Sequence, residues 1–159
     1  MADPHPPARR ATTYDVPELT RLRGVMLAAM GVDLDADATW RARCEAALVE
    51  QLGGERFAAY VVDAPGGGLA SCGVGCAEVR LPSPGRPGVV GHVGNMCTDP
   101  AHRRRGHARA VLDGLLGWFV AQGVNRVELA ATAEGQGLYQ GAGFRVPEWP
   151  QLRWYPPRP

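Results

Sequence analysis

The stretch that decides the fold is DPAHRRRGHA, residues 99–108, which lies between two segments of different periodicity. Before it, residues 89–98 (VVGHVGNMCT) are rich in β-branched residues and glycine and predict a strand. After it, apolar residues recur at helical spacing over residues 105–122, which predicts a helix packed on a sheet. The free N–H groups and dipole of a helix start favour an anion, and three arginines add charge and donors. We therefore expect a phosphorylated ligand at this turn.

Length and composition fit one globular domain. The chain has 159 residues, of which 45% are hydrophobic and 21% charged, enough for a sizeable core. We expect a flexible proline-rich tail at residues 1–7 and a single domain over residues 8–159. The formal net charge of +1 argues against a nucleic-acid partner, and the locally clustered arginines suit a small anion.

Membrane and secretory segments are not predicted. No apolar run reaches the roughly 18 residues that a membrane span requires. The N-terminal residues lack the apolar core of a signal peptide, so we expect a cytoplasmic protein without a membrane partner.

Cysteine and histidine spacing predicts neither a metal nor a disulfide. The four cysteines form no CxxC pair and are typical of small buried apolar residues in a reducing compartment. His102 and His107 flank the arginine turn without metal-ligand partners at suitable spacing, and we expect both at the surface of the helix start.

The order of periodic segments predicts an α/β fold. Strands are expected over residues 9–12, 57–62, 69–80, 89–98, 127–131, 144–146 and 152–155, and helices over residues 14–30, 38–52, 105–122 and 134–140. The three-strand meander in the middle calls for antiparallel pairs, whereas the strand–helix–strand unit of residues 89–131 requires a parallel crossover. The sheet is therefore expected to be mixed and mostly antiparallel, with flanking helices.

Two separated motifs give the chain a family resemblance. RxxGxA at residues 103–108 resembles the acyl-CoA loop of the GCN5-related N-acetyltransferase (GNAT) family, and LYxxxGF at residues 138–144 resembles its C-terminal signature. The order of elements also matches that fold over nearly all residues after the tail. The resemblance implies a GNAT-like acyl-CoA N-acyltransferase fold with a splayed parallel strand pair. It also implies acetyl-CoA as co-substrate, with no metal, and an acetyl transfer to a primary amine by direct attack in a ternary complex.

The resemblance assigns the acyl-CoA contacts by position. Family members hold the pyrophosphate on the N–H groups of the turn, which here comprises Arg103, Arg104, Arg105, Gly106, His107 and Ala108. Glycine lets the backbone approach a phosphate without a Cβ. The pantetheine arm inserts between the splayed strands beside Met96, Cys97 and Thr98, where a bulge would aim an N–H at the thioester carbonyl. Thr132 stands where members often have a CoA-contacting asparagine.

Catalytic roles follow the same resemblance, but the base stays open. Tyr139 matches the tyrosine that protonates the departing CoA thiolate, and an ordinary tyrosine pKa of about 10 keeps it protonated. The fourth strand lacks the glutamate that many members use as base and offers Asn95 and His92 instead, of which asparagine cannot usefully accept a proton. Glu78 on the preceding strand and Asp33 in the inter-helix loop are alternatives. Deprotonating an alkylamine at pH 7 costs about 4–5 kcal/mol, so a base, a water chain or an already neutral amine is needed.

The acceptor is expected to be a small-molecule or peptide amine. The loop of residues 31–37 carries Asp33, Asp35 and Asp37, and an acidic lining would attract a cationic amine. Trp149 either walls the acceptor pocket or serves packing or a homodimer interface.

Three alternative functions stay open from the sequence. A non-catalytic acyl-CoA-binding or regulatory module would keep the phosphate turn and lack the acid and base. A covalent mechanism through Cys97 would need a thiolate and a base, and the sequence indicates neither. A nucleotide-phosphate enzyme is disfavoured, because the chain lacks GxxxxGK[ST].

Overall fold

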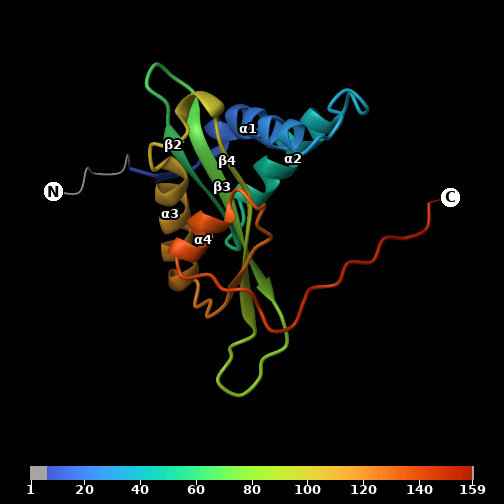
Figure 1. The fold of residues 1–159 in the computed structure, drawn as a ribbon, viewed down its shortest axis with the longest axis vertical. Helices are drawn as coiled ribbons and strands as arrows, with labels where there is room; N and C mark the ends of the chain where they lie inside the picture. The colour runs from blue at the N-terminus through green and yellow to red at the C-terminus, as the bar shows by residue number, and fades with distance from the viewer. Residues whose placement is uncertain (1–6, 159) are drawn as a thin grey trace.

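The computed structural model describes residues 7–158 and contains one five-stranded sheet (Figure 1). The strands, in spatial as in sequence order, are β1 (Arg9–Arg10), β2 (Phe57–Asp63), β3 (Leu69–Val79), β4 (Val89–Thr98) and β5 (Val127–Glu128). The first three pairings are antiparallel and β4–β5 is parallel, which confirms the predicted mixed sheet. The predicted N-terminal tail lies outside the described residues except for Pro7.

Helices cover both faces of this sheet. They are α1 (Val16–Ala29), α2 (Trp40–Leu52), α3 (His107–Ala121) and α4 (Gln136–Gly141), with 3₁₀ turns at Thr13–Asp15 and Pro100–His102. α1 and α2 lie on one side of the sheet and α3 on the other (Figure 1). Local signals explain the ends: Pro17 lies in the first turn of α1, and Gly123 follows α3 with a positive φ of 73°.

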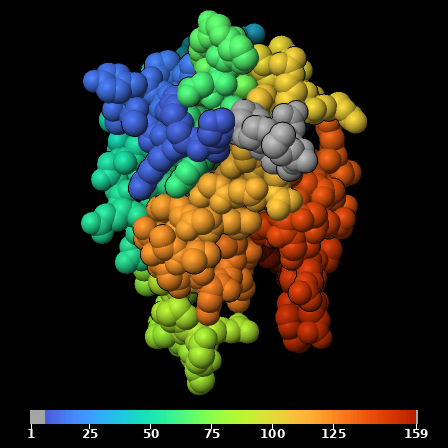
Figure 2. Space-filling model, turned by 90° about the vertical axis from the view of Figure 1, so that its left-hand side faces the viewer, coloured from blue at the N-terminus to red at the C-terminus, as the bar shows by residue number. Residues whose placement is uncertain are grey.

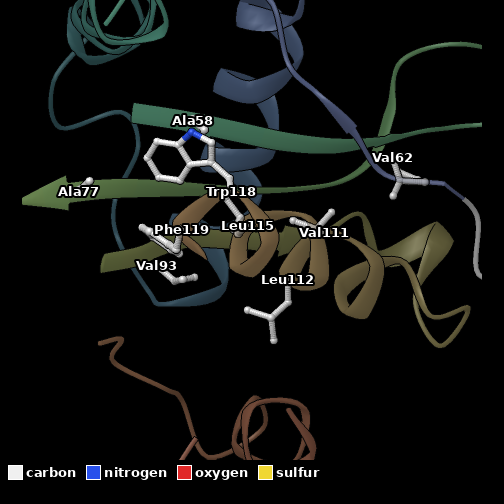
Figure 3. Close-up of a cluster of buried hydrophobic side chains, with 10 residues drawn as sticks. Ala58, Val62, Ala77, Val93, Val111, Leu112, Leu115, Trp118 and Phe119 are labelled. Atoms are coloured by element: carbon white, nitrogen blue, oxygen red, sulfur yellow. The ribbon is translucent and has the colours of Figure 1, made fainter. Parts of the chain in front are cut away.

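α3 provides the larger hydrophobic cluster. Its inward residues keep the helical spacing of the sequence: Val111, Leu112, Leu115, Trp118 and Phe119. Figure 3 shows them with residues of the strands, among them Ala58, Ala77 and Val93. The helix lies very close to the sheet, because a Cβ at Gly75 or Gly91 would come within 2.9 or 2.7 Å of the Phe119 ring. Glycines on the strands thus allow α3 to pack close to the sheet.

The opposite face carries a second cluster under α1 and α2. Leu19 and Leu22 of α1 are fully buried there against Val61 and the thiols of Cys72 and Cys97. All four cysteines are free, and Cys72 and Cys97 are the two that are buried. These two therefore pack as small apolar residues, as their spacing predicts.

The predicted closing strands at residues 144–146 and 152–155 are wrong. After α4 the chain runs on without strand pairing to residue 158, and β5 ends at Glu128 instead of residue 131. Prolines at 147 and 150 remove N–H donors, and a two-residue β5 offers almost no edge to pair with. Five apolar residues of this segment are at least 75% exposed: Val146, Trp149, Leu152, Trp154 and Tyr155. Figure 2 shows this red segment and the β3–β4 hairpin loop projecting from the body.

Candidate active site

The site begins at an open edge of β4. In the described residues, β4 pairs with β5 only at Gly91↔Val127 and His92↔Glu128. From residue 93 to residue 98 the strand keeps its β3 neighbour but has no strand partner on the β5 side. The predicted splayed parallel pair is therefore present. Its free N–H and C=O groups can bind an extended chain in the manner of an added strand.

A β-bulge interrupts β4 beside this open edge. Cys72 pairs with Cys97 and Val74 with Gly94, so that Asn95 and Met96 together face the single residue Gly73. Asn95 adopts a left-handed conformation with φ of 50°. A bulge takes an N–H out of the ladder and re-aims it. The bulge expected at the end of this strand is thus present, and it begins at Asn95.

The turn after β4 has the backbone of an anion site. Arg104 and Gly106 both have positive φ, 61° and 78°, and Gly106 immediately precedes α3. Where left-handed residues alternate with residues of ordinary conformation, successive backbone N–H groups point toward one position. Arg103 Nε donates to the Thr98 carbonyl at 3.4 Å, which ties the turn to the end of β4. The side chains of Arg104 and Arg105 are exposed, so the backbone is the preformed part of the site.

His107 supports this turn from inside. The expectation that it lies at the surface is wrong: only 7% of the residue is exposed, because α3 turns it toward the protein. Burial lowers its pKa below the ordinary 6.5, and the nearby charges of His102 and Arg105 act in the same direction. Neither ring nitrogen has a hydrogen-bond partner in the described residues. The imidazole is therefore neutral at pH 7.

Tyr139 lies on α4, on the α3 side of the sheet. Its ring packs edge-on against Phe144 at a centroid distance of 5.9 Å, and burial raises the pKa of its hydroxyl. Arg109 of α3 donates to the Gly141 carbonyl at 3.3 Å, which fixes α4 relative to α3. Thr132 has a local task, because its hydroxyl accepts from the Gly135 N–H at 3.2 Å just before α4. A protonated phenol is thus held on a short, anchored helix.

The structure brings two of the three candidate bases together. His92 Nε2 lies 2.8 Å from Glu78 Oε2 on the neighbouring strand. Glu78 is exposed, and hydrogen bonds from Arg80 and then His92 lower the pKa of its carboxyl. A lowered pKa weakens Glu78 as a base, and its contact with Nε2 can orient the His92 ring. His92 lies three residues before Asn95, about 10 Å along the strand.

The third candidate base, Asp33, lines a cavity of about 550 Å³ between α1, α2 and β4. The cavity is bounded by Arg23, Leu27, Val32, Asp33, Leu34, Asp37, Trp40, Arg43, Cys44, Ala47, Leu48, Gln51, Phe57, Val74 and Asn95. Asp37 also borders it, whereas Asp35 does not. Asp37 is paired with Arg43, so the acidic lining is partly neutralised. Because Asn95 belongs to the wall, the cavity reaches the β4 bulge from the α1/α2 face.

Two polar residues of this cavity, Arg23 and Asn95, were given no role in the site by sequence reasoning. Arg23 of α1 donates from Nη1 to Asn95 Oδ1 at 3.1 Å, across 72 positions of sequence. A Gly-Asn pair inside a β-branched run is a signal for the bulge, because asparagine tolerates positive φ. Nothing local distinguishes Arg23 from other arginines on a helix.

A nucleophilic Cys97 is disfavoured by the structure, since burial raises the pKa of its thiol.

Comparison with known proteins decides the family. The sequence matches the model of the acetyltransferase (GNAT) family over residues 38–144, more than half of the chain and both motifs of the sequence analysis. The chain belongs to the GNAT family. None of the curated proteins matches it significantly. The fold of this GNAT domain is shared by solved structures of low sequence identity.

Three of these structures illustrate the similarity. A predicted acetyltransferase from Clostridium acetobutylicum, solved with acetyl-CoA, has a TM-score of 0.79 and 20% identity over 92% of this chain and 94% of that one. A GCN5-related N-acetyltransferase from Ralstonia eutropha JMP134 has a TM-score of 0.77 and 23% identity over 92% and 97%. Glucosamine-6-phosphate N-acetyltransferase from Arabidopsis thaliana has a TM-score of 0.75 and 16% identity over 94% and 97%. At these identities the likeness shows a GNAT fold.

Residues 7–158 of this GNAT domain contain neither a metal-binding cluster nor a membrane-spanning helix. No group of three or more histidine, cysteine, aspartate or glutamate side chains there could hold a metal ion. Within the same residues, no helix is both long and apolar enough to cross a membrane.

Proposed function

We propose that this GNAT domain transfers an acetyl group from acetyl-CoA to a primary amine by direct attack within a ternary complex. The observation that carries the proposal is the bulged, unpaired edge of β4, which leads directly into the turn at residues 103–108. An open strand edge followed by a preformed anion turn suits a ligand that is an extended amide chain ending in phosphates.

The donor would occupy the α3 side. The N–H groups from Arg104 to Ala108 would hold the pyrophosphate, and the pantetheine amides would pair with β4 near Met96, Cys97 and Thr98. The N–H displaced by the bulge would donate to the thioester carbonyl and stabilise the oxyanion of the tetrahedral intermediate. Thr132 would border the CoA path from the start of α4.

The acceptor would enter through the cavity on the α1/α2 face and meet the thioester at the bulge. His92, oriented by Glu78, or Asp33 would take a proton from the ammonium group through water. The neutral amine then forms a C–N bond at the thioester carbon, and the C–S bond breaks. Two protons leave the acceptor nitrogen. The base takes the first before attack, Tyr139 protonates the departing sulfur, and the second nitrogen proton, released as the amide forms, returns to Tyr139 through solvent.

One observation favours a non-catalytic acyl-CoA-binding module instead. β4 carries no carboxylate, and its histidine lies about 10 Å from the bulge, beyond direct hydrogen-bond reach. The two functions share the donor site and differ only in chemistry.

Calorimetric titration with acetyl-CoA and release of free CoA thiol with a panel of primary amines separate them. Binding together with amine-dependent thiol release supports the transferase. Tight binding without thiol release from any amine supports the binding module, and absence of binding contradicts both.

A further inference from the structure

The inner end of the α1/α2 cavity holds a positive charge without a counter-ion. Arg23 is half-buried, and its one hydrogen bond in residues 7–158 goes to the neutral amide oxygen of Asn95. No carboxylate of those residues lies within 4.0 Å of its guanidinium group. A guanidinium group carries five N–H donors in a fork that matches a carboxylate. Most donors of Arg23 are therefore free for a ligand.

Of the other charges of the cavity, Arg43 and Asp37 neutralise each other, and Asp33 is an anion. Arg43 is paired with Asp37, which also accepts from the Thr39 backbone at 2.8 Å. Asp33 is exposed and accepts from the backbone N–H of Asp35 at 3.0 Å. The cation that can still recruit a ligand is thus Arg23, at the end of the cavity beside β4.

We propose that the acceptor is an amino carboxylate whose carboxylate group binds Arg23. The proposal rests on the proposed transferase function and names its substrate class. Arg23 contacts Asn95, and Asn95 opens the bulge at which the thioester would lie. A carboxylate on Arg23 therefore places an amine attached one carbon away next to the reacting carbon, a positioning effect that favours attack.

The apolar residues of the cavity wall favour an apolar side chain on this amino acid. Leu27, Leu34 and Leu48 give it apolar walls, and Trp40 of α2 adds an aromatic one. An apolar side chain gains by leaving water in such a cavity, whereas an ammonium or second carboxylate loses hydration. The acceptor class is therefore an α-amino acid with an aliphatic or aromatic side chain, such as leucine.

A comparison of matched acceptors on the unmodified protein tests the carboxylate directly. L-Leucine and L-leucinamide have nearly the same shape, but the amide lacks the charge. The amine of leucinamide, with a pKa near the roughly 7.7–8.0 of peptide amino termini, is more often neutral, so chemistry alone favours it. We expect kcat/KM for leucine to exceed that for leucinamide by about ten- to a hundredfold. Equal values, or a preference for leucinamide, overturn the proposal. A preference for the aminophosphonate analogue of leucine overturns it in favour of a phosphate-bearing acceptor.

Two variants locate the effect. Arg23→Gln should abolish the preference for leucine over leucinamide, and Arg23→Lys should retain part of it. Arg43→Gln removes a cation from the same cavity that is already paired, so the preference should persist. A preference that survives Arg23→Gln in a folded variant contradicts the assignment of the site.

A binding measurement separates this proposal from the proposed function. Calorimetric titration of leucine and of leucinamide into the CoA-saturated protein requires no turnover. If no amine is acetylated but leucine binds and leucinamide does not, the transferase function fails and the carboxylate site stands. If amines are acetylated and both ligands bind alike, the function stands and the site fails.

Discussion

Gly73 of β3 lies directly beneath the side chain of Met96 at the bulge of β4. A Cβ at position 73 would sit 2.3 Å from the Met96 sulfur, 2.8 Å from a methyl group of Val111 and 3.1 Å from one of Leu115. Because Gly73 has no side chain, the bulge of β4 can pack against α3. The height of α3 and the position of the donor edge are consequently coupled.

Gly73→Ala should damage both stability and donor binding. The added methyl group overpacks three neighbours, and such overpacking costs about 1–3 kcal/mol. Urea unfolding should show this loss, and calorimetry should show weaker acetyl-CoA binding because Met96 must move. Gly94→Ala is the matched control, since the nearest atom to its added methyl group lies at 3.8 Å. Equal stability of the two variants would show that the sheet relaxes freely here.

The turn before α3 predicts that backbone shape outweighs side-chain charge. Gly106 has φ of 78°, and alanine there costs about 1–2 kcal/mol and disturbs the donor N–H groups. Arg104→Gly removes a charge but fits the observed φ of 61° without strain. Calorimetry should therefore give a larger rise of the acetyl-CoA Kd for Gly106→Ala than for Arg104→Gly. The reverse order would assign the affinity to the arginine charges.

Tyr139→Phe should separate chemistry from binding. The ring packing against Phe144 is kept, while the proposed proton donor to the leaving sulfur is lost. Stopped-flow or steady-state assays should show kcat lower by about 10²–10⁴-fold, with the acetyl-CoA Kd unchanged. A variant with full kcat would remove Tyr139 from the proton path.

The three candidate bases can be ranked by single substitutions. If the His92–Glu78 pair acts, His92→Gln should lower kcat/KM by about 10²–10⁴-fold, Glu78→Gln should lower it less, and Asp33→Asn should leave it near the original value. An acceptor whose amine is already neutral at pH 7 should restore much of the rate to His92→Gln, because it needs no base. A loss confined to Asp33→Asn would move the base to the inter-helix loop.

Buried His107 predicts a loss of stability in mild acid. Because its pKa is lowered in the folded chain, the unfolded chain binds more protons below the ordinary value of 6.5. Its contribution is complete above that pH and is lost as the pH falls through the folded-state pKa. Urea unfolding from about pH 7.5 to about pH 5 should show a decline that is smaller in His107→Leu. Carboxylates whose pKa is lowered titrate at lower pH and do not account for a decline in this range. Equal declines in the unmodified protein and in His107→Leu would therefore contradict the assignment to His107.

Local patterns were sufficient to predict the framework of the fold. The apolar spacing along α3 and the glycine-dotted strands were each visible within a few residues, and together they predicted the mixed sheet and the turn at residues 103–108. The segment after α4 was predicted incorrectly, because its alternating apolar residues satisfied the strand pattern. The strand pattern did not reveal that β5 would be too short to pair with them.

The candidate site was only partly accessible from the sequence. Motifs assigned Tyr139 and the donor turn, but no motif could bring His92 to Glu78 or Arg23 to Asn95. Both contacts depend on the register between strands, or on where α1 crosses the sheet. Such contacts are properties of the assembled fold, and short-range periodicity does not encode them.

The placement of the two hydrophobic clusters on opposite faces of the sheet has a consequence for how this domain can change. The turn at residues 103–108 belongs to the α3 face, and the cavity beside Arg23 belongs to the α1/α2 face; they approach each other at a few residues of β4. Under the proposed function, substitutions in α1 and α2 should therefore change which amine is accepted and leave acetyl-CoA binding at residues 103–108 unchanged. In protein engineering, the α3 face would be kept constant and the α1/α2 face varied. Libraries aimed at new acceptors should be confined to residues 23–48.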